Sequence, residues 1–392
     1  MTALGPLDPV HLPVGVRARR IADVNGMDVH ILEAGFEQTG RPLVVALHGF
    51  PELSYSWRDV LAPLAAAGFH VVAPDQRGYG RTTGWSGAYD QDLGSCSMLQ
   101  LARDVLALVQ ALGYRSVSTL VGHDFGSPVA AWCALIRPDV FRSVVLMSAP
   151  FAGPPALPQR DTAGAVVRAP GDGLTPELQA AMAGLPRPRK HYHAYYATRQ
   201  ADADMARCPE GVRAFLRAYF HYKSADWAGN KPYRLGGWTA DDMARLPTYY
   251  VMDREQTMAE VVRPYMPTAE DIARCRWLPE HELAVYADEF GRTGFQGGLN
   301  WYRTRFDIRL NSELTLFSGR TIDVPSLFIA GASDWGVYQA PGAYERMQQQ
   351  VCTRMHGCHL IDGAGHWVMQ EQPDAVLGLL VPFCERNRAV GR

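Results

Sequence analysis

The stretch Leu120-Val121-Gly122-His123-Asp124-Phe125-Gly126 decides the fold that this sequence predicts. The apolar, β-branched run 116–121 is typical of a short buried strand, and the apolar residues of 127–137 recur at helical spacing. Gly122 and Gly126 flank the turn between these two elements, where a small residue allows a sharp bend. The sequence therefore predicts a strand, a tight elbow and a helix, with Asp124 at the centre of the elbow.

Strands and helices alternate on both sides of this elbow. An Asn25-Gly26 turn between alternating apolar runs predicts a hairpin over 16–34. The run 42–47 is uninterrupted and apolar, as expected for a strand in a sheet buried on both faces. The repeated alternation of strands and helices predicts parallel strand–helix–strand units with helices on both faces, an α/β fold. These strands are predicted at 42–47, 69–73, 116–121, 143–147, 324–330 and 359–361, and the helices at 53–67, 97–112, 127–137, 340–350 and 368–388.

Residues 151–320 interrupt the alternation. They are richer in proline, glycine and aromatic residues, and they contain helical patches without a strand–helix–strand repeat. We therefore expect an α/β core formed by 1–150 and 321–392, with 151–320 inserted as a mainly helical cap domain. Because ligands bind at the carboxyl ends of parallel strands, where the insertion would leave the sheet, we expect the cap to cover the site.

Composition limits the classes of function. The chain has 392 residues, of which 47% are hydrophobic, and its net charge of -2 with no basic block argues against nucleic acid or anionic membranes as partners. No apolar run reaches the roughly 18 residues of a membrane span, and 1–16 lacks the apolar segment of a signal peptide. The seven scattered cysteines are typical of reduced thiols, so we expect a cytoplasmic protein.

One cluster of residues could suggest a metal. Cys352, His356, Cys358 and His359 lie close together in the sequence. A second ligand pair with zinc-like spacing does not accompany them, which argues against a structural zinc site. We expect neither a metal nor a cofactor.

Four polar side chains follow predicted strands: His48, Asp124, Asp334 and His366. Because the carboxyl ends of parallel strands meet at one edge of a sheet, we expect these side chains to lie close together. Along the chain, Asp124, Asp334 and His366 follow the order nucleophile, acid and histidine, which resembles that of the α/β-hydrolases. The usual elbow sequence G-x-S-x-G is absent, so a carboxylate nucleophile is favoured over a serine.

The chemistry follows from the residue types. An aspartate, with an ordinary pKa near 3.9, is ionised at pH 7 and needs no base to act as a nucleophile. Asp124 could displace a leaving group at carbon and form an alkyl ester. His366 would then activate water against that ester, while Asp334 would orient the imidazole and stabilise its charged form.

The tetrahedral oxyanion of the second step needs hydrogen-bond donors. We predict that the backbone N–H groups of Phe50 and Phe125 supply them. His48 is expected to organise the loop that carries Phe50, and His123 is expected to pack behind the nucleophile. A plainer interpretation exists for Asp334, which could cap the helix that follows it.

Several segments together resemble the epoxide hydrolase branch of the α/β-hydrolase superfamily. They are His48-Gly49-Phe50-Pro51, Pro74-Asp75-Gln76-Arg77-Gly78-Tyr79-Gly80, Gly122-His123-Asp124-Phe125-Gly126, Gly297-Gly298-Leu299-Asn300-Trp301-Tyr302-Arg303 and Gly365-His366-Trp367. The resemblance implies hydrolysis of a small apolar epoxide to a vicinal diol, with water as the second substrate and without a cofactor.

The resemblance also implies two cap tyrosines that polarise the epoxide. It assigns one of them to Tyr302. The other lies in the aromatic stretch 191–196, where the pattern Tyr-x-x-Tyr-aromatic favours Tyr192, with Tyr195 as the alternative. A phenol with a pKa near 10 stays protonated at pH 7 and can donate to the leaving oxygen.

Two features depart from the family pattern. Phe125 stands where many relatives carry tryptophan, and the insertion is long. Within it, the segment 221–262 has several aromatic residues to which the sequence assigns no role: Trp227, Tyr233, Trp238, Tyr249 and Tyr250.

Other functions remain as alternatives. A haloalkane or haloacid dehalogenase would use the same aspartate ester, but those families typically hold the halide with other residues than Phe50 and Phe125. An esterase or lactonase is a second alternative. A non-catalytic ligand-binding protein of this fold should lack one of the three catalytic residues, and all three are present. The sequence leaves open whether the chain forms a homodimer.

Overall fold

An eight-stranded sheet, with strand order β1-β2-β4-β3-β5-β6-β11-β12, forms the core of the protein. The computed structural model describes residues 4–157, 159–160, 166–167 and 173–388. The hairpin β1 (Val16–Val24) and β2 (Met27–Ala34) pairs antiparallel, and Asn25 and Gly26 both have positive φ, as a tight hairpin turn requires. The hairpin predicted from the Asn-Gly turn is therefore present.

The other strands run parallel to one another, from β4 to β12. Every residue of β3, β4, β5, β6 and β11 is buried, as expected for a sheet covered on both faces. The predicted α/β fold class is confirmed. The strand bounds are β3 (Leu43–Leu47), β4 (His70–Pro74), β5 (Thr119–His123), β6 (Val144–Met147), β11 (Ser326–Gly331) and β12 (Met355–Ile361).

The strand before the elbow begins later than the sequence predicts. β5 starts at Thr119 rather than at 116, because Val117 makes only an isolated bridge to Phe141 outside the main ladder. The strand also extends to His123, which pairs with Met147 on β6. This extension places Asp124 directly after the last paired residue.

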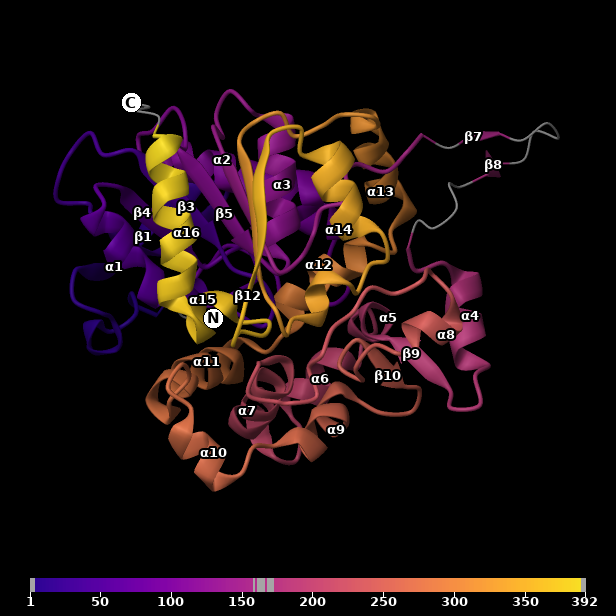
Figure 1. The fold of residues 1–392 in the computed structure, drawn as a ribbon. Helices are drawn as coiled ribbons and strands as arrows, with labels where there is room; N and C mark the ends of the chain where they lie inside the picture. The colour runs from indigo at the N-terminus through magenta and orange to yellow at the C-terminus, as the bar shows by residue number, and fades with distance from the viewer. Residues whose placement is uncertain (1–3, 158, 161–165, 168–172, 389–392) are drawn as a thin grey trace.

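Helices pack on both faces of the sheet. Figure 1 shows α16 in front of the sheet and α2 and α3 behind it. The predicted final helix is divided in two because Pro373 begins a new helix after Gln372. The α-helices are α1 (Arg58–Ala66), α2 (Met98–Ala111), α3 (Gly126–Ile136), α14 (Ala343–Arg346), α15 (Val368–Glu371) and α16 (Pro373–Arg386), and the shorter 3₁₀ or π turns are Pro9–His11, Ser54–Trp57, Leu93–Cys96, Trp335–Val337 and Met347–Val351.

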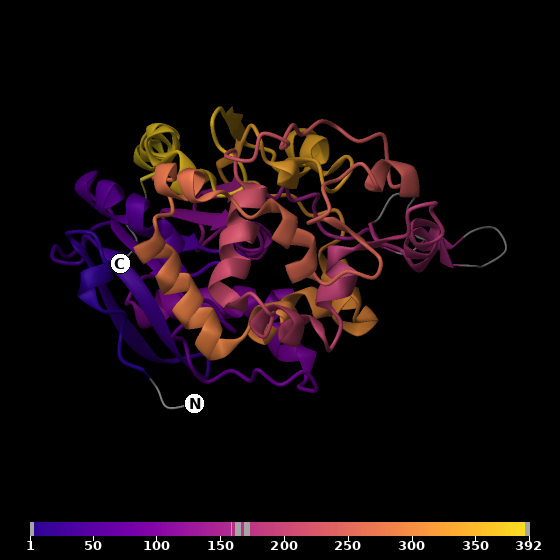
Figure 2. The same ribbon diagram turned by 90° about the horizontal axis from the view of Figure 1, so that it is seen from below.

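The chain between β6 and β11 is mainly helical, and most of its helices gather at one end of the sheet, whereas α13 lies beside the core near α14 (Figures 1 and 2). Its helices are α4 (Pro176–Ala183), α5 (Tyr192–Tyr196), α6 (Ala201–Ala206), α7 (Gly211–Lys223), α8 (Ala240–Met243), α9 (Met258–Val262), α10 (Ala269–Arg274), α11 (Glu280–Thr293), α12 (Gln296–Thr304) and α13 (Ile308–Leu314), with 3₁₀ turns at Arg263–Tyr265 and Thr315–Phe317. Two short antiparallel pairs join them: β9 (Arg189–His191) with β10 (Val251–Asp253), and β7 (Gln159–Arg160) with β8 (Val166–Val167).

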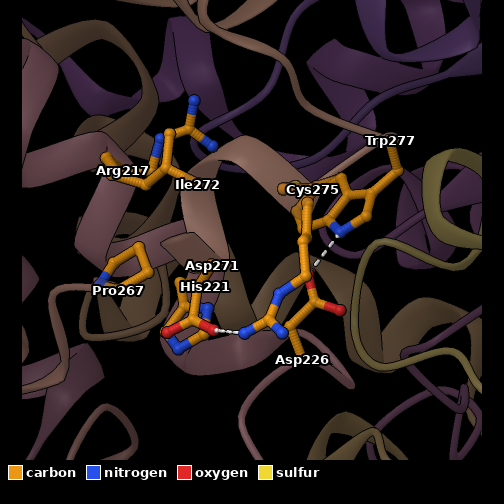
Figure 3. Close-up of a pocket in the computed structure, with 9 residues that line it drawn as sticks. Arg217, His221, Asp226, Pro267, Asp271, Ile272, Cys275 and Trp277 are labelled. Atoms are coloured by element: carbon orange, nitrogen blue, oxygen red, sulfur yellow. Dashed lines mark hydrogen bonds and ion pairs between the residues drawn. The ribbon is translucent and has the colours of Figure 1, made fainter. Parts of the chain in front are cut away.

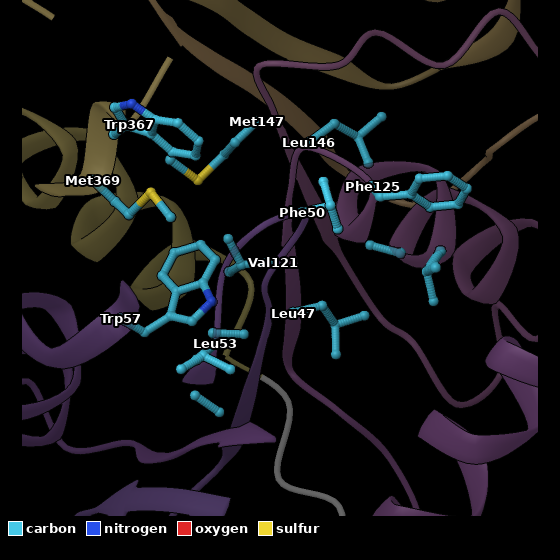
Figure 4. Packing of buried hydrophobic residues seen from close by; sticks show 14 of the residues in the cluster. Leu47, Phe50, Leu53, Trp57, Val121, Phe125, Leu146, Met147, Trp367 and Met369 are labelled. Atoms are coloured by element: carbon cyan, nitrogen blue, oxygen red, sulfur yellow. The ribbon is translucent and has the colours of Figure 1, made fainter. Parts of the chain in front are cut away.

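The hydrophobic core extends to the carboxyl ends of the central strands. In Figure 4, Leu47, Val121 and Leu146 project from three neighbouring strands, and Phe50 and Phe125 follow two of those strands in the same buried cluster. The loops that carry these two phenylalanines are therefore fixed by core packing rather than left free at the surface.

Three findings concern the classes considered from the sequence. None of the helices in the described part of the chain is long and apolar enough to cross a membrane. All seven cysteines are free. Among the described residues, no group of three or more His, Cys, Asp or Glu side chains is arranged to hold a metal ion.

Candidate active site

Asp124 sits at the bend between β5 and α3 with a φ of 50°. This left-handed conformation is unfavourable for most residues with a side chain, and it forms the sharp bend between the strand and the helix. Small neighbours make the bend possible. A Cβ atom at Gly126 would lie 2.5 Å from the carbonyl oxygen of Leu47, and one at Gly49 would lie 2.3 Å from the Cβ atom of Asp124.

The two carboxylate oxygens of Asp124 have different partners. Oδ1 accepts a hydrogen bond from the backbone N–H of Phe50 at 2.9 Å. Oδ2 lies 3.2 Å from Nε2 of His366. Burial alone would raise the pKa of Asp124, but the hydrogen bond and charge of His366, together with the charge of Lys223, hold that pKa well below its ordinary value. The carboxylate is therefore ionised and aimed at the histidine.

The histidine is oriented from its other nitrogen. Nδ1 of His366 lies 3.1 and 3.2 Å from the two carboxylate oxygens of Asp334, and both side chains are almost fully buried. Asp334 also caps the short turn after it, because its Oδ1 accepts from the N–H of Gly336 at 2.7 Å. Its pKa is lowered: burial opposes ionisation, but the charge of His366 outweighs that effect. One carboxylate thus both caps the turn and holds the imidazole.

The loop that carries His366 is bonded to the end of α7 in the insertion. The N–H of His366 donates to the carbonyl oxygen of Lys223 at 2.9 Å, and Nε1 of Trp367 donates to the carbonyl oxygen of Phe220 at 2.8 Å. The Glu371 carboxylate accepts from the N–H groups of Gly365 and Trp367 on one side and of Ala225 on the other. The histidine is therefore positioned by both parts of the chain.

His48 lies beneath the loop that carries Phe50. Its Nδ1 donates to the carbonyl oxygen of Gly49 at 2.9 Å, and its Nε2 accepts from the N–H of Gln76 at 3.1 Å. Burial lowers the pKa of His48, which matches this neutral tautomer. The ring links two loops and does not reach the Asp124 carboxylate through any hydrogen bond among the described residues.

His123 forms a buried pair with Glu52, a residue that the sequence analysis did not select. Its Nδ1 lies 2.6 Å from Oε2 of Glu52, and its Nε2 lies 2.7 Å from the carbonyl oxygen of His366. Burial would lower the pKa of His123, but the charge and hydrogen bond of Glu52 outweigh burial and raise it. Glu52 also accepts from the N–H of Gly49 at 2.9 Å. The pair therefore fixes both the Phe50 loop and the His366 loop.

Tyr302, on α12, packs directly over the strand ends. Its ring centroid lies 5.5 Å from that of Phe50 and 5.1 Å from that of Phe125. Burial and the charge of Asp124 raise the pKa of its hydroxyl well above the ordinary value, so it keeps its proton. Among the described residues this hydroxyl has no hydrogen-bond partner, which leaves it free to donate to a ligand.

The structure separates the two candidates for the second cap tyrosine. The ring of Tyr192 lies 5.9 Å from that of Tyr302, and its pKa is raised by burial and then by the charge of Asp124. Its hydroxyl donates to Oε1 of Gln339 at 3.0 Å. Tyr195 instead donates to Asp204 at 3.0 Å on the far side of α5. Of these two, Tyr192 is the one that packs against Tyr302.

Tyr196 is a further tyrosine of the cluster that the sequence analysis missed. Its ring lies 5.2 Å from Phe50 and 5.0 Å from Tyr302, and its hydroxyl donates to the hydroxyl of Tyr219 at 3.3 Å. The helical spacing of Tyr192 and Tyr196, four residues apart, was the available signal, since such residues share one face of a helix.

A cavity lies among the helices between β6 and β11, and none of these residues lines it. It is a cavity of about 200 Å³ between α7 and α10 (Figure 3). Its charged groups already have partners: Arg217 bonds Leu278 and Glu280, and Arg274 bonds Asp271. None of the residues described above lines it, so it is not the candidate active site.

An acidic side chain on a strained elbow, an aspartate–histidine pair opposite it and a mostly parallel sheet beneath them define a hydrolase of the α/β-hydrolase fold. Residues 42–166 match the family model described as alpha/beta hydrolase fold. The chain is 32% identical to Epoxide hydrolase A of Mycobacterium tuberculosis, over 94% of this chain and 98% of that protein. The chain therefore belongs to the epoxide hydrolase family, as its motifs predicted.

Solved structures agree with this assignment. An epoxide hydrolase from an endophytic Streptomyces is 31% identical and superposes with a TM-score of 0.72, covering 96% of this chain and 98% of that one. Potato epoxide hydrolase I is 28% identical with a TM-score of 0.69, over 95% of this chain and 99% of that one.

Proposed function

We propose that this protein hydrolyses a small, mainly apolar epoxide to a vicinal diol through a covalent ester on Asp124. The observation that supports this proposal most directly is that the two carboxylate oxygens of Asp124 have different partners. Oδ1 accepts from the N–H of Phe50, and Oδ2 points toward His366. An ionised carboxylate held in this way is a preformed nucleophile.

In the first step, Oδ2 attacks an epoxide carbon and the C–O bond of the ring breaks. The epoxide oxygen takes up a proton as it leaves. Tyr302 is proposed as the principal donor because its hydroxyl has no protein partner among the described residues, and Tyr192 as the second, after it releases Gln339. Proton donation by a positioned acid contributes about 10²- to 10⁴-fold.

In the second step, His366 removes a proton from water, and the resulting hydroxide attacks the carbonyl carbon of the ester. The oxyanion develops on Oδ1, where the N–H of Phe50 already donates, and we propose the N–H of Phe125 as the second donor. Asp334 stabilises the imidazolium that forms. Collapse of the intermediate breaks the ester C–O bond, and the leaving diol oxygen takes the proton of the hydroxyl group derived from water, which regenerates the Asp124 carboxylate. The proton on His366 then returns to the tyrosinate that donated in the first step, through water, and the diol is released.

The rest of the molecule has supporting roles in this proposal. Residues 1–150 and 321–392 act as the catalytic core, and 151–320 act as the cap that supplies the tyrosines and the aromatic wall of the substrate site. His48 and His123 hold the two catalytic loops. The free cysteines support a cytoplasmic location.

The proposal is tested with the variant Asp124→Asn and with an exposed control, Asp139→Asn. Diol release from an aryl or alkyl epoxide and halide release from the matched haloalkane are measured together. Diol formation that is lost in Asp124→Asn and kept in Asp139→Asn supports the proposal. Full diol formation by Asp124→Asn would refute the nucleophile, and halide release without diol would assign the protein as a dehalogenase.

Oxygen isotopes test the ester directly. In a single turnover in ¹⁸O-water, the new diol oxygen should come from Asp124, so the diol should stay unlabelled while the enzyme takes up the label. A labelled diol in the first turnover would mean that water attacks the epoxide directly.

A further inference from the structure

A lysine is buried beside the candidate active site. Lys223, the last residue of α7, is 3% exposed. Its ammonium lies 5.3 Å from the ring centroid of Tyr219, 5.0 Å from Tyr250 and 5.4 Å from Trp367. Aromatic faces attract a cation, but they do not accept the hydrogen bonds that an ammonium loses when it leaves water.

Neither Lys223 nor its neighbour Tyr250 has a hydrogen-bond acceptor. Within the described residues, the Lys223 ammonium makes no hydrogen bond or ion pair. The Tyr250 hydroxyl is also without a partner there, although that residue is only 1% exposed. Buried polar groups in native proteins are almost always paired, so the buried, unpaired Tyr250 hydroxyl, beside an ammonium that donates to no described residue, indicates that an acceptor comes from outside the chain.

Both residues are tied to the catalytic loops. The carbonyl oxygen of Lys223 accepts from the N–H of His366, and its ammonium faces the ring of Trp367. The carbonyl oxygen of Tyr250 accepts from the N–H of Tyr192 at 2.8 Å, and the two rings lie 5.1 Å apart. The two donors therefore stand between the histidine loop and the tyrosines of the cap.

Electrostatics place the ammonium near the nucleophile as well. Burial opposes ionisation of Asp124 and Asp334. The pKa of Asp124 is held down first by His366 and then by the charge of Lys223, and that of Asp334 by His366, by the N–H of Gly336 and then by Lys223. The two carboxylates already balance the lysine charge in part. The lysine therefore has nearby negative charge, but it has no hydrogen-bond acceptor among the described residues.

We propose that Lys223 and Tyr250 bind one oxygen acceptor of the substrate, a carbonyl-type oxygen borne by a ketone, ester, amide or carboxylate away from the epoxide ring. This inference rests on the proposed epoxide hydrolysis and names its substrate class. The aromatic wall takes the apolar body of the substrate, and the two donors select for the oxygen. It also gives a role to two residues of the segment 221–262, which the sequence could not assign.

The expected selectivity follows from the hydrogen-bond donors that an unsuitable substrate would leave without an acceptor. A hydrocarbon epoxide would keep both donors buried and unpaired, whereas a carbonyl oxygen would satisfy them. A hydrogen bond to a charged group contributes enough to give a preference of about 10- to 100-fold in kcat/KM.

The test uses three epoxides of equal chain length that end in a methyl group, a primary amide or a carboxylate. We expect the wild-type enzyme to prefer one or both of the oxygen-bearing substrates over the hydrocarbon by about 10- to 100-fold. Lys223→Met and Tyr250→Phe should each reduce that ratio, while Lys231→Met, an exposed lysine on the same segment, should keep it. A preference for the amide assigns a neutral carbonyl, and one for the acid assigns a carboxylate.

Equal kcat/KM values for all three substrates in the wild type would overturn the inference, as would an equal loss on every substrate in Lys223→Met. Thermal unfolding identifies any variant that fails to fold, and Tyr250→Phe, which removes a single oxygen atom, then decides. Calorimetric binding of the saturated amide and acid, which have no epoxide, separates the two proposals. Their weaker binding to Tyr250→Phe would support the inference even if no epoxide were hydrolysed, an outcome that would refute only the proposed function.

Discussion

Replacing Asp334 by asparagine should separate the two half-reactions. The variant removes a buried negative charge that lies 3.1 Å from Nδ1 of His366. The first step needs only the Asp124 carboxylate and a proton donor, so it should proceed at nearly the wild-type rate. The second step creates an imidazolium, which Asp334→Asn can no longer stabilise. We therefore expect the alkyl ester to accumulate.

The size of the effect follows from the geometry. Two unit charges 3.1 Å apart attract by roughly 5 kcal/mol at the effective dielectric constant of about 20 that suits protein sites. Loss of that attraction corresponds to a decrease of about 10³- to 10⁴-fold in the rate of ester hydrolysis. Because the pair is almost fully buried, added salt should not restore the rate.

The assay is a single-turnover experiment followed by mass spectrometry of the intact protein. Asp334→Asn should gain the mass of one substrate molecule within the mixing time and lose it slowly. Asp323→Asn changes an exposed aspartate near the same strand and serves as the control. If turnover fell without accumulation of the adduct, or if both steps slowed equally, the assignment of Asp334 to the second step would be wrong.

Three further variants test other parts of the structure. Gly126→Ala places a Cβ atom 2.5 Å from the carbonyl oxygen of Leu47, so it should lower the free energy of unfolding by about 1–3 kcal/mol, measured with urea. Tyr302→Phe should slow formation of the ester by about 10²- to 10⁴-fold in stopped-flow experiments while its hydrolysis stays unchanged. Glu33 is buried, which would raise its pKa, but its hydrogen bond to His70 and two arginines lower that pKa to about 2. The folded state therefore binds fewer protons than the unfolded state between about pH 4.5 and 2, and about 3 kcal/mol of stability present above this range is lost through it. Glu33→Gln should remove this part of the acid sensitivity in urea titrations at several pH values.

Each of these expectations can fail clearly. An unchanged urea midpoint in Gly126→Ala would mean that the elbow relaxes without cost. An unchanged ester rate in Tyr302→Phe would transfer the role of proton donor to another cap tyrosine. An acid-unfolding curve of Glu33→Gln that parallels the wild type would mean that other carboxylates govern acid stability.

Local sequence signals predicted the elbow and the order of its partners. Gly122 and Gly126 mark the bend, Asp334 follows a largely apolar run, and His366 lies in a glycine-rich loop after a predicted short strand. Because parallel strands end at one edge of a sheet, the sequence alone predicted that Asp124, Asp334 and His366 would meet. The structure brings these three side chains within hydrogen-bond distance.

Long-range polar contacts could not be predicted in the same way. Glu52 meets His123 across 71 positions, and nothing in either local sequence requires the pair. The insertion lacks a regular period, so its many aromatic residues could not be ranked, and Tyr196, Lys223 and Tyr250 became distinguishable only through their contacts. The division of the last predicted helix, in contrast, had a local signal in Pro373, because proline favours the first position of a helix.

The bonds between α7 and the histidine loop also constrain how this enzyme can open. A hinged lid that swung away as one body would break the contacts of Lys223 with His366, of Phe220 with Trp367 and of Ala225 with Glu371. Every opening event would then displace His366. Passage of molecules should instead use local movements elsewhere in the insertion, and any exchange of insertions between relatives would have to preserve the end of α7 to keep the histidine in place.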